Sequence, residues 1–170
     1  MKKKVLLVIL VLSLLFLGQR VGASVASPTS LVGTREAGEF KRLEIPEAQA
    51  YASIQVLFQL PNGTWEEPNH VSAWELEPYP GAFYLHRDGL GFRLDQLRPG
   101  SKAFLYRDWL METEPLQLRV FKLEVIEALD EFLVWRRVGG SIFAFVTCHP
   151  AEDPLAPQRF VVWAVAMNQD

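Results

Sequence analysis

The chain has 170 residues, a formal net charge of −3 and 49% hydrophobic residues. This length suits a single domain with its own hydrophobic core, and the apolar content excludes a mainly disordered chain. The acidic balance excludes a protein that binds nucleic acid through a basic surface, because Lys and Arg are not in excess.

Residues 1–26 have the pattern of a targeting segment. Three lysines at 2–4 precede an uncharged, mostly apolar run at 5–18. A basic start and a short apolar run are typical of a secretory signal peptide, and a membrane-spanning helix needs roughly 20 apolar residues. Small residues then offer cleavage positions after Ala23 or Ala26. An uncleaved signal anchor is the alternative. Both alternatives predict an exported domain, either membrane-anchored or secreted.

The remaining chain is acidic. Four of the 17 basic residues and none of the 20 acidic residues lie in or beside the targeting segment, so 13 basic and 20 acidic residues remain, a formal charge of −7. Residues 27–39 are rich in small and polar side chains, which indicates a linker. We expect one domain over residues 40–170.

Most of the domain has strand patterns. The expected strands, in chain order, are 40–45, 53–60, 82–86, 102–107, 119–128, 132–138, 141–147 and 159–167. Residues 65–81 are Pro-rich and predict a long loop, and 92–100 predict one short helical turn ended by Pro99-Gly100. The glycine pair at 139–140 predicts a turn between two strands. The fold prediction is therefore mainly β, with about eight short strands in a closed barrel or a sandwich.

The single cysteine, Cys148, ends one of these predicted strands. In an exported chain a lone cysteine is an inert core residue, an intermolecular partner or a reactive thiol. A strand end exposes a thiol better than a strand centre does. Arg159 begins the next predicted strand, so pairing of the two strands would set a permanent positive charge beside the thiol. That charge suits a developing oxyanion.

A nucleophilic thiol also needs a base, and the chain has three histidines. His70 lies in the Pro-rich loop, and His149 would point to the strand face opposite Cys148. His86 ends an apolar strand of its own, which makes it the candidate base. Cys148 and His86 would then be two strand-end residues, distant in sequence and close in the fold.

Other interpretations of these residues remain open. A free cysteine is among the most buried residue types, so Cys148 is also compatible with core packing. His86 is compatible with a strand end of no special role, and Arg159 with an ion pair to Glu152 or Asp153. No residue spacing matches a usual zinc site and no phosphate-binding glycine loop is present, so no metal or other cofactor is predicted.

Several segments together resemble the sortase family. FAFVTCHP…QRFVVWA resembles the sortase C-terminal signature, in which a strand runs into Thr-Cys and an Arg precedes a short apolar strand. AFYLHRD…GFRLDQLRPGSKAFLYR resembles the segment that carries the sortase histidine. GTWEEPNHVSAWELEPYPG and LEIP resemble passages further upstream. These segments cover residues 43–166 in the family's order.

The resemblance implies a closed sortase-like β-barrel and a cysteine transpeptidase. Such enzymes cleave a C-terminal sorting signal through a thioester acyl-enzyme and transfer the acyl group to an amine. On the matching positions, Cys148 is the nucleophile, His86 the acid and base, and Arg159 the oxyanion partner, with Thr147 lining the oxyanion site. The implied partners are a protein with a sorting signal and an amine acceptor from the cell wall or another protein, with the membrane reached through the N-terminal segment.

Two positions depart from the family pattern. Leu85 stands where the family commonly has a glycine before its histidine, and Gly100-Ser101 replaces the usual Gly-Asp. These departures leave the sortase subgroup open, together with two other functions. One is a sortase-like barrel that binds a peptide or partner without turnover, and the other is a hydrolase that uses water as acceptor.

Overall fold

A computed structural model describes residues 36–61, 71–150 and 155–167 of the chain. The predicted targeting segment, most of the predicted linker and His70 lie outside these ranges, so the predictions made for them stay predictions. No helix within the described ranges has the length and apolar character needed to cross a membrane.

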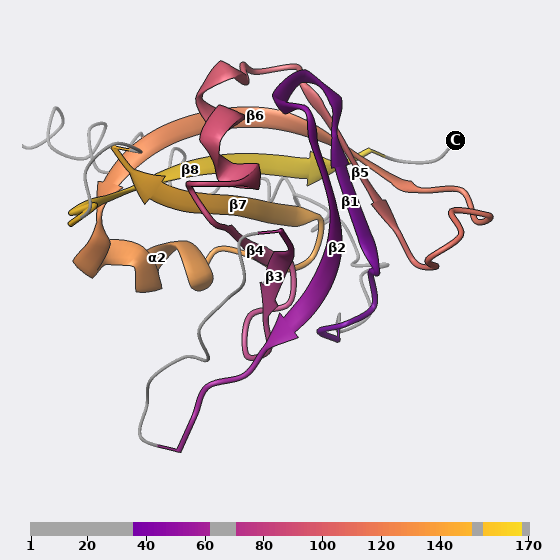
Figure 1. Ribbon diagram of the computed structural model, residues 1–170, viewed down its shortest axis with the longest axis horizontal. Coiled ribbons are helices and arrows are strands. Elements are labelled where there is room, and N and C mark those ends of the chain that lie inside the picture. Colours follow the sequence, from indigo (N-terminus) through magenta and orange to yellow (C-terminus); the bar gives the residue numbers. More distant parts are fainter. Residues whose placement is uncertain (1–35, 62–70, 151–154, 168–170) are drawn as a thin grey trace, which may run out of the picture. The chain divides into compact units, whose positions relative to one another are not determined.

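The described residues contain eight strands that close into a barrel, as the sequence predicted (Figure 1). Around the barrel the order is β1-β2-β3-β4-β7-β8-β6-β5. The pairs β2–β3 and β4–β7 are parallel and the others are antiparallel. The strands are β1 (Arg42–Ile45), β2 (Ala50–Leu57), β3 (Ala73–Leu76), β4 (Ala82–Leu85), β5 (Lys102–Tyr106), β6 (Leu116–Glu127), β7 (Ile142–His149) and β8 (Gln158–Ala166).

The helical pieces are short. They are the 3-10 turns η1 (Pro46–Ala48), η2 (Leu90–Gln96) and η3 (Ala128–Asp130), and the α-helix α2 (Glu131–Trp135). The predicted helical turn at 92–100 overlaps η2, and its Leu94 and Leu97 pack in the main core as expected.

Strand β7 is buried on both of its faces. Phe143 and Phe145 point into the barrel and join the main core. The alternate residues Ala144 and Val146 belong to a second apolar cluster outside the barrel, which Trp135 of α2 covers. A strand covered on both faces shows a continuous apolar run instead of alternation, which explains the run that the sequence shows there.

The predicted strand at 132–138 is wrong, because this segment forms most of α2. Val134 and Trp135 are buried against the outer face of the barrel, while Phe132 and Leu133 are exposed. A short apolar run has no periodicity that separates a strand from one turn of helix. The turn at Gly139-Gly140 has positive φ at both residues, and it leads from α2 into β7 instead of joining two strands.

The predicted loop at 65–81 contains a strand that the sequence interpretation missed. All four residues of β3 are buried, and β3 lies between a parallel neighbour, β2, and an antiparallel one, β4. The prolines nearby indicated irregular chain, and four residues are too few to show a pattern against that background.

A buried carboxylate in β3 fixes the entry of the chain into the barrel. Glu75 is fully buried, and its two oxygens accept hydrogen bonds from the backbone N–H of Gly38 at 2.7 Å and of Gly81 at 2.9 Å. Burying a carboxylate costs free energy unless it accepts hydrogen bonds. Glu75 is therefore stable in its buried position only while both loops supply their N–H groups. The same bonds hold both loops against β3.

Replacing Glu75 by Ala should destabilise the fold. The change leaves two backbone N–H groups buried near β3 without their acceptor, and we expect a loss of roughly 3 kcal/mol in the free energy of unfolding. Urea denaturation measures this loss. The matched control is Glu77→Ala, an exposed glutamate just past the same strand, which should change stability by less than about 0.5 kcal/mol. Equal effects of the two substitutions would show that the hydrogen bonds of Glu75 do not stabilise the fold.

Candidate active site

Cys148 and Arg159 are direct neighbours across a strand pair. Strands β7 and β8 are antiparallel, and their register sets Cys148 opposite Arg159. This confirms the predicted pairing of the two strands. Cys148 is a free, half-buried cysteine at the end of β7. It lies on the outer side of the barrel with Val146, and thus under the layer that α2 forms.

His86 reaches the same edge of the sheet from the other side of β7. Strand β4 runs parallel to β7 and pairs Tyr84 with Val146, so the register continued by two residues sets His86 beside Cys148. The His86 side chain is about one quarter exposed, and its Nδ1 lies 3.9 Å from a carboxylate oxygen of Asp88. The Asp88 N–H also donates to this Nδ1 at 3.4 Å, which leaves Nε2 to carry the proton of a neutral imidazole.

A glycine allows η2 to close over the two strand ends. A β-carbon on Gly91 would lie 2.2 Å from Thr147 Oγ1 and 2.7 Å from the carbonyl oxygen of Leu85, closer than van der Waals contact allows. The Gly91 N–H donates to the His86 carbonyl at 3.0 Å. The close approach therefore orders the backbone just before His86 and just before Cys148.

Thr147 and Leu85 point away from the outer face that carries Cys148. The Thr147 hydroxyl oxygen is buried under Gly91 and lacks a hydrogen-bond partner among the residues that the structure describes. Leu85 is fully buried in the main core of the barrel. The departure from the family's glycine before the histidine is thus accommodated inside the barrel.

Tyr84 contacts the thiol, a feature that the sequence interpretation missed. Its hydroxyl oxygen lies 2.6 Å from Cys148 Sγ, and the two groups share a hydrogen bond. Burial, and then this bond, raise the pKa of Tyr84 above its ordinary value of 10.0. The hydroxyl therefore keeps its proton at neutral pH. A thiolate has no proton to donate, so Tyr84 must be the donor whenever Cys148 is ionised.

The Arg159 guanidinium is held by a carboxylate of α2 and by two backbone carbonyls at the start of β8. Its Nε lies 3.3 Å from a carboxylate oxygen of Glu131, and its Nη1 donates to the carbonyls of Ala156 at 2.9 Å and Gln158 at 3.0 Å. The carboxylates expected as its partners, Glu152 and Asp153, lie outside the described residues. Glu131 was not anticipated, because it begins the helix that was predicted as a strand.

Burial raises the pKa of the Glu131 carboxyl above its ordinary value of 4.5, although Arg159 acts in the opposite direction. The ion pair therefore does not fully offset the desolvation of this carboxylate, as is common for buried pairs. The charges of Arg159 and Glu131 also act on Tyr84, with opposite signs. These four side chains thus form one electrostatic group on the outer face of the barrel, namely Cys148, Tyr84, Arg159 and Glu131.

The other candidate features lie elsewhere. The His149 ring packs beside Phe160, with ring centroids 6.0 Å apart, on the strand face opposite Cys148. Within the described ranges, no group of three His, Cys, Asp or Glu side chains is placed to hold a metal ion.

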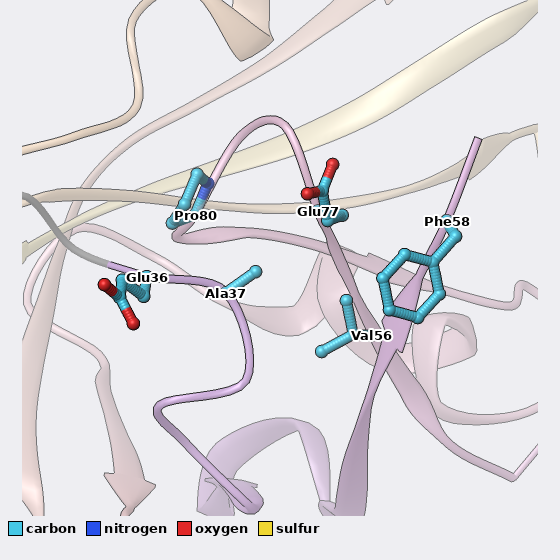
Figure 2. Close-up of a pocket in the computed structure, with 6 residues that line it drawn as sticks. All are labelled: Glu36, Ala37, Val56, Phe58, Glu77 and Pro80. Carbon is cyan, nitrogen blue, oxygen red and sulfur yellow. The ribbon is translucent and has the colours of Figure 1, made fainter.

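A hollow lies at the end of the barrel opposite Cys148. Its volume is about 450 Å³, and its lining consists of Glu36, Ala37, Val56, Phe58, Glu77 and Pro80 (Figure 2). These residues surround the ends of β2 and β3, and β3 is antiparallel to β4, so the hollow and Cys148 lie at opposite ends of the sheet. None of the residues that line this hollow is a nucleophile.

No protein-family model and no curated protein matches this chain. Solved sortase structures do match its fold. The pilus-related sortase C of Group B Streptococcus is 16% identical over 79% of this chain and 70% of its own, with a TM-score of 0.60. Clostridium perfringens sortase C, solved with the C-terminal cell wall sorting motif, is 15% identical over 79% of this chain and 73% of its own, with a TM-score of 0.56. Listeria monocytogenes sortase A is 11% identical over 76% and 88%, with a TM-score of 0.57. The chain therefore has the sortase fold.

Removing the tyrosine hydroxyl should slow the reaction of the Cys148 sulfur. In Tyr84→Phe a thiolate loses a hydrogen bond of roughly 1.5 kcal/mol. The rate of Cys148 alkylation by iodoacetamide at a fixed, neutral pH should therefore fall by roughly tenfold. Tyr79→Phe is the control, because Tyr79 stacks on Trp135 in the same outer cluster. An alkylation rate that is the same in both variants would contradict the role of Tyr84.

The raised pKa of Glu131 predicts a dependence of stability on pH. The folded chain holds the Glu131 proton more tightly than the unfolded chain does, so ionising Glu131 lowers stability as the pH rises above about 4.5. Glutamine resembles the neutral acid and cannot ionise. We expect Glu131→Gln to gain stability relative to the unchanged chain between pH 4.5 and pH 8.

Urea midpoints measured across this pH range test the prediction. The control is Glu114→Gln, in which an exposed glutamate before β6 is changed in the same way. A stability difference between the unchanged chain and Glu131→Gln that does not vary with pH would show that the carboxylate is fully stabilised by Arg159.

Proposed function

We propose that this protein is an exported cysteine transpeptidase that cleaves a C-terminal sorting signal and transfers the new acyl group to an amine. One observation carries the proposal: in a barrel of the sortase fold, the register of β7 sets Cys148 opposite Arg159, with His86 ending the parallel neighbour β4. The C-terminal cell wall sorting motif with which the Clostridium perfringens sortase C was solved supports the substrate class.

The first half of the proposed reaction forms a thioester. The Cys148 thiolate attacks the scissile carbonyl carbon, and the carbonyl electrons move onto its oxygen. The Arg159 guanidinium stabilises this oxyanion, because its charge is permanent and Glu131 together with two backbone carbonyls fix its position. When the intermediate collapses, the C–N bond breaks and His86 in its protonated form donates a proton to the leaving amine.

The second half of the reaction reverses these roles. An incoming amine attacks the thioester carbonyl, and neutral His86 accepts the proton that the amine loses. The C–S bond then breaks, which releases the new amide and restores the Cys148 thiolate. Tyr84 donates its hydrogen bond to that thiolate, a role suited to a hydroxyl that stays protonated at neutral pH. Thr147 would line the oxyanion site through its backbone, since its side chain lies under Gly91.

Two alternatives differ from this proposal in their last step or in turnover. A hydrolase would use water in place of the amine. A non-catalytic barrel would bind the peptide only, and it was suggested by Leu85 at a position that is usually glycine. The burial of Leu85 in the core gives that substitution a structural explanation, which favours the catalytic proposal over a purely binding one.

The proposal includes export, because the apolar run at 5–18 follows three lysines. The domain would then work outside the cytoplasm, as a secreted or a membrane-anchored enzyme. The acceptor would be an amine of the cell wall or of another protein, and no cofactor takes part in the proposed steps.

A trapped acyl-enzyme tests the proposal directly. The full chain is incubated with a library of peptides that carry sorting signals, and the mass of the intact protein is measured by mass spectrometry. We expect a mass increase on Cys148 that disappears when a glycine-based amine is added, together with a ligated peptide. Cys148→Ala should lose both signals, while His149→Ala, which changes the opposite strand face, should keep them.

Each outcome assigns a function. A ligated peptide supports transfer, and a cleaved peptide without ligation supports a hydrolase. Absence of both products with wild-type protein, or product formation by Cys148→Ala, would overturn the proposal.

A further inference from the structure

The hairpin that joins β5 to β6 exposes three consecutive apolar side chains. Trp109 is 54% exposed, Leu110 75% and Met111 39%. Single exposed apolar residues are common on soluble domains, but three in a row at the end of a hairpin concentrate apolar surface at one projecting point.

This apolar tip, residues 109–111, is held in a defined conformation. The Asp108 carboxylate accepts hydrogen bonds from the backbone N–H groups of Glu112 and Thr113, both at 3.0 Å, and from the Thr113 hydroxyl. Met111 has a left-handed backbone, with φ at 59°, which turns the chain back toward β6. The bonds from Thr113 are the main reason that the pKa of Asp108 falls to about 2. The carboxylate that orders the tip therefore stays ionised at neutral and mildly acidic pH.

The base of this hairpin is also the place where the chain enters the barrel. Arg107, the first residue after β5, forms an ion pair with Glu39 at 2.8 Å, and its guanidinium lies over the ring of Phe40. The Lys41 N–H donates to the carbonyl of Tyr106 at 2.7 Å. The segment just before β1 is thus fixed against the root of the apolar tip.

We propose that the apolar tip docks into the surface of a lipid bilayer and orients the barrel on the membrane. The chemistry of the tip suits the boundary between headgroups and acyl chains, where a tryptophan ring places its apolar body in lipid and its N–H in water. Leu110 and Met111 add aliphatic area beside it.

The N-terminal segment supports a membrane as the partner of this tip. The apolar run predicted to enter the membrane ends at residue 18, and about 20 residues separate it from Glu39. Fully extended, they reach at most about 70 Å, so a chain that keeps this segment keeps the root of the hairpin within that distance of the bilayer.

The charges around the tip select the kind of lipid. Asp108, Glu112 and Glu114 flank it, and the cation next to it in the sequence, Arg107, is paired with Glu39. Anionic headgroups would be repelled by these carboxylates, so the docking is expected to depend on apolar burial in a neutral bilayer and not on acidic lipids.

Tryptophan fluorescence in the full chain tests this proposal. The protein is reconstituted into phosphatidylcholine vesicles whose acyl chains carry bromine, which quenches only tryptophans that enter the bilayer. Residues 1–26 contain no tryptophan, so the predicted membrane segment gives no signal of its own. We expect quenching in the unchanged chain and the loss of at least half of it in Trp109→Phe.

A pair of charge substitutions separates docking from general apolar exposure. Leu110→Glu places a charge in the tip and should abolish the quenching of Trp109. Leu129→Glu changes a residue that is 91% exposed beyond the other end of β6, and it should leave the quenching as in the unchanged chain.

Three results would overturn the proposal. The first is equal quenching in the unchanged chain and in Trp109→Phe. The second is quenching that survives Leu110→Glu. The third is no quenching in any variant, which would show that the tip does not enter lipid. The measurement uses no peptide substrate, so its outcome is independent of the transpeptidase proposal.

Discussion

The candidate active site depends on the register of one strand, β7. On one side β7 is parallel to β4, so the carboxyl ends of both strands, and with them Cys148 and His86, meet at the same edge of the sheet. On the other side β7 is antiparallel to β8, so the amino end of β8 brings Arg159 to that edge. A slip of one residue would turn Cys148 into the barrel. Such a slip would put the large Phe143 and Phe145 where the smaller Ala144 and Val146 pack, so the difference in size between the two faces opposes it.

The layer outside the barrel gives the site its electrostatic character. Helix α2 covers β7 and β8 with Val134 and Trp135, and the same helix supplies Glu131 to Arg159. Charges in a partly buried site interact more strongly than they would in water, and they are also more costly to keep. The raised pKa values of Glu131 and Tyr84 reflect this cost. The arrangement keeps the proton of Tyr84 in place next to the Cys148 sulfur.

The sequence was sufficient to predict the barrel and three residues at the site edge. Cys148 and Arg159 could be predicted because they border consecutive strands with strong apolar patterns. His86 could be predicted because it follows another apolar strand. Tyr84 was not, since a tyrosine in an apolar strand has the pattern of a core residue and only the structure pairs it with the thiol. Glu131 was missed for a different reason. The segment after it is too short for a helical period to appear, so residues 132–138 were predicted as a strand and Glu131 was assigned to no element.

Strand β6 connects the candidate site to the opposite end of the barrel. Its first residues pair with β5 beside the apolar tip, and Ile126 near its end pairs with Arg159. About ten residues separate these points, a length of about 30 Å along an extended strand. A barrel docked through its tip would therefore hold Cys148 well away from the bilayer. Under the two proposals together, a peptide would reach the thiol on the side of the barrel that faces away from the bilayer.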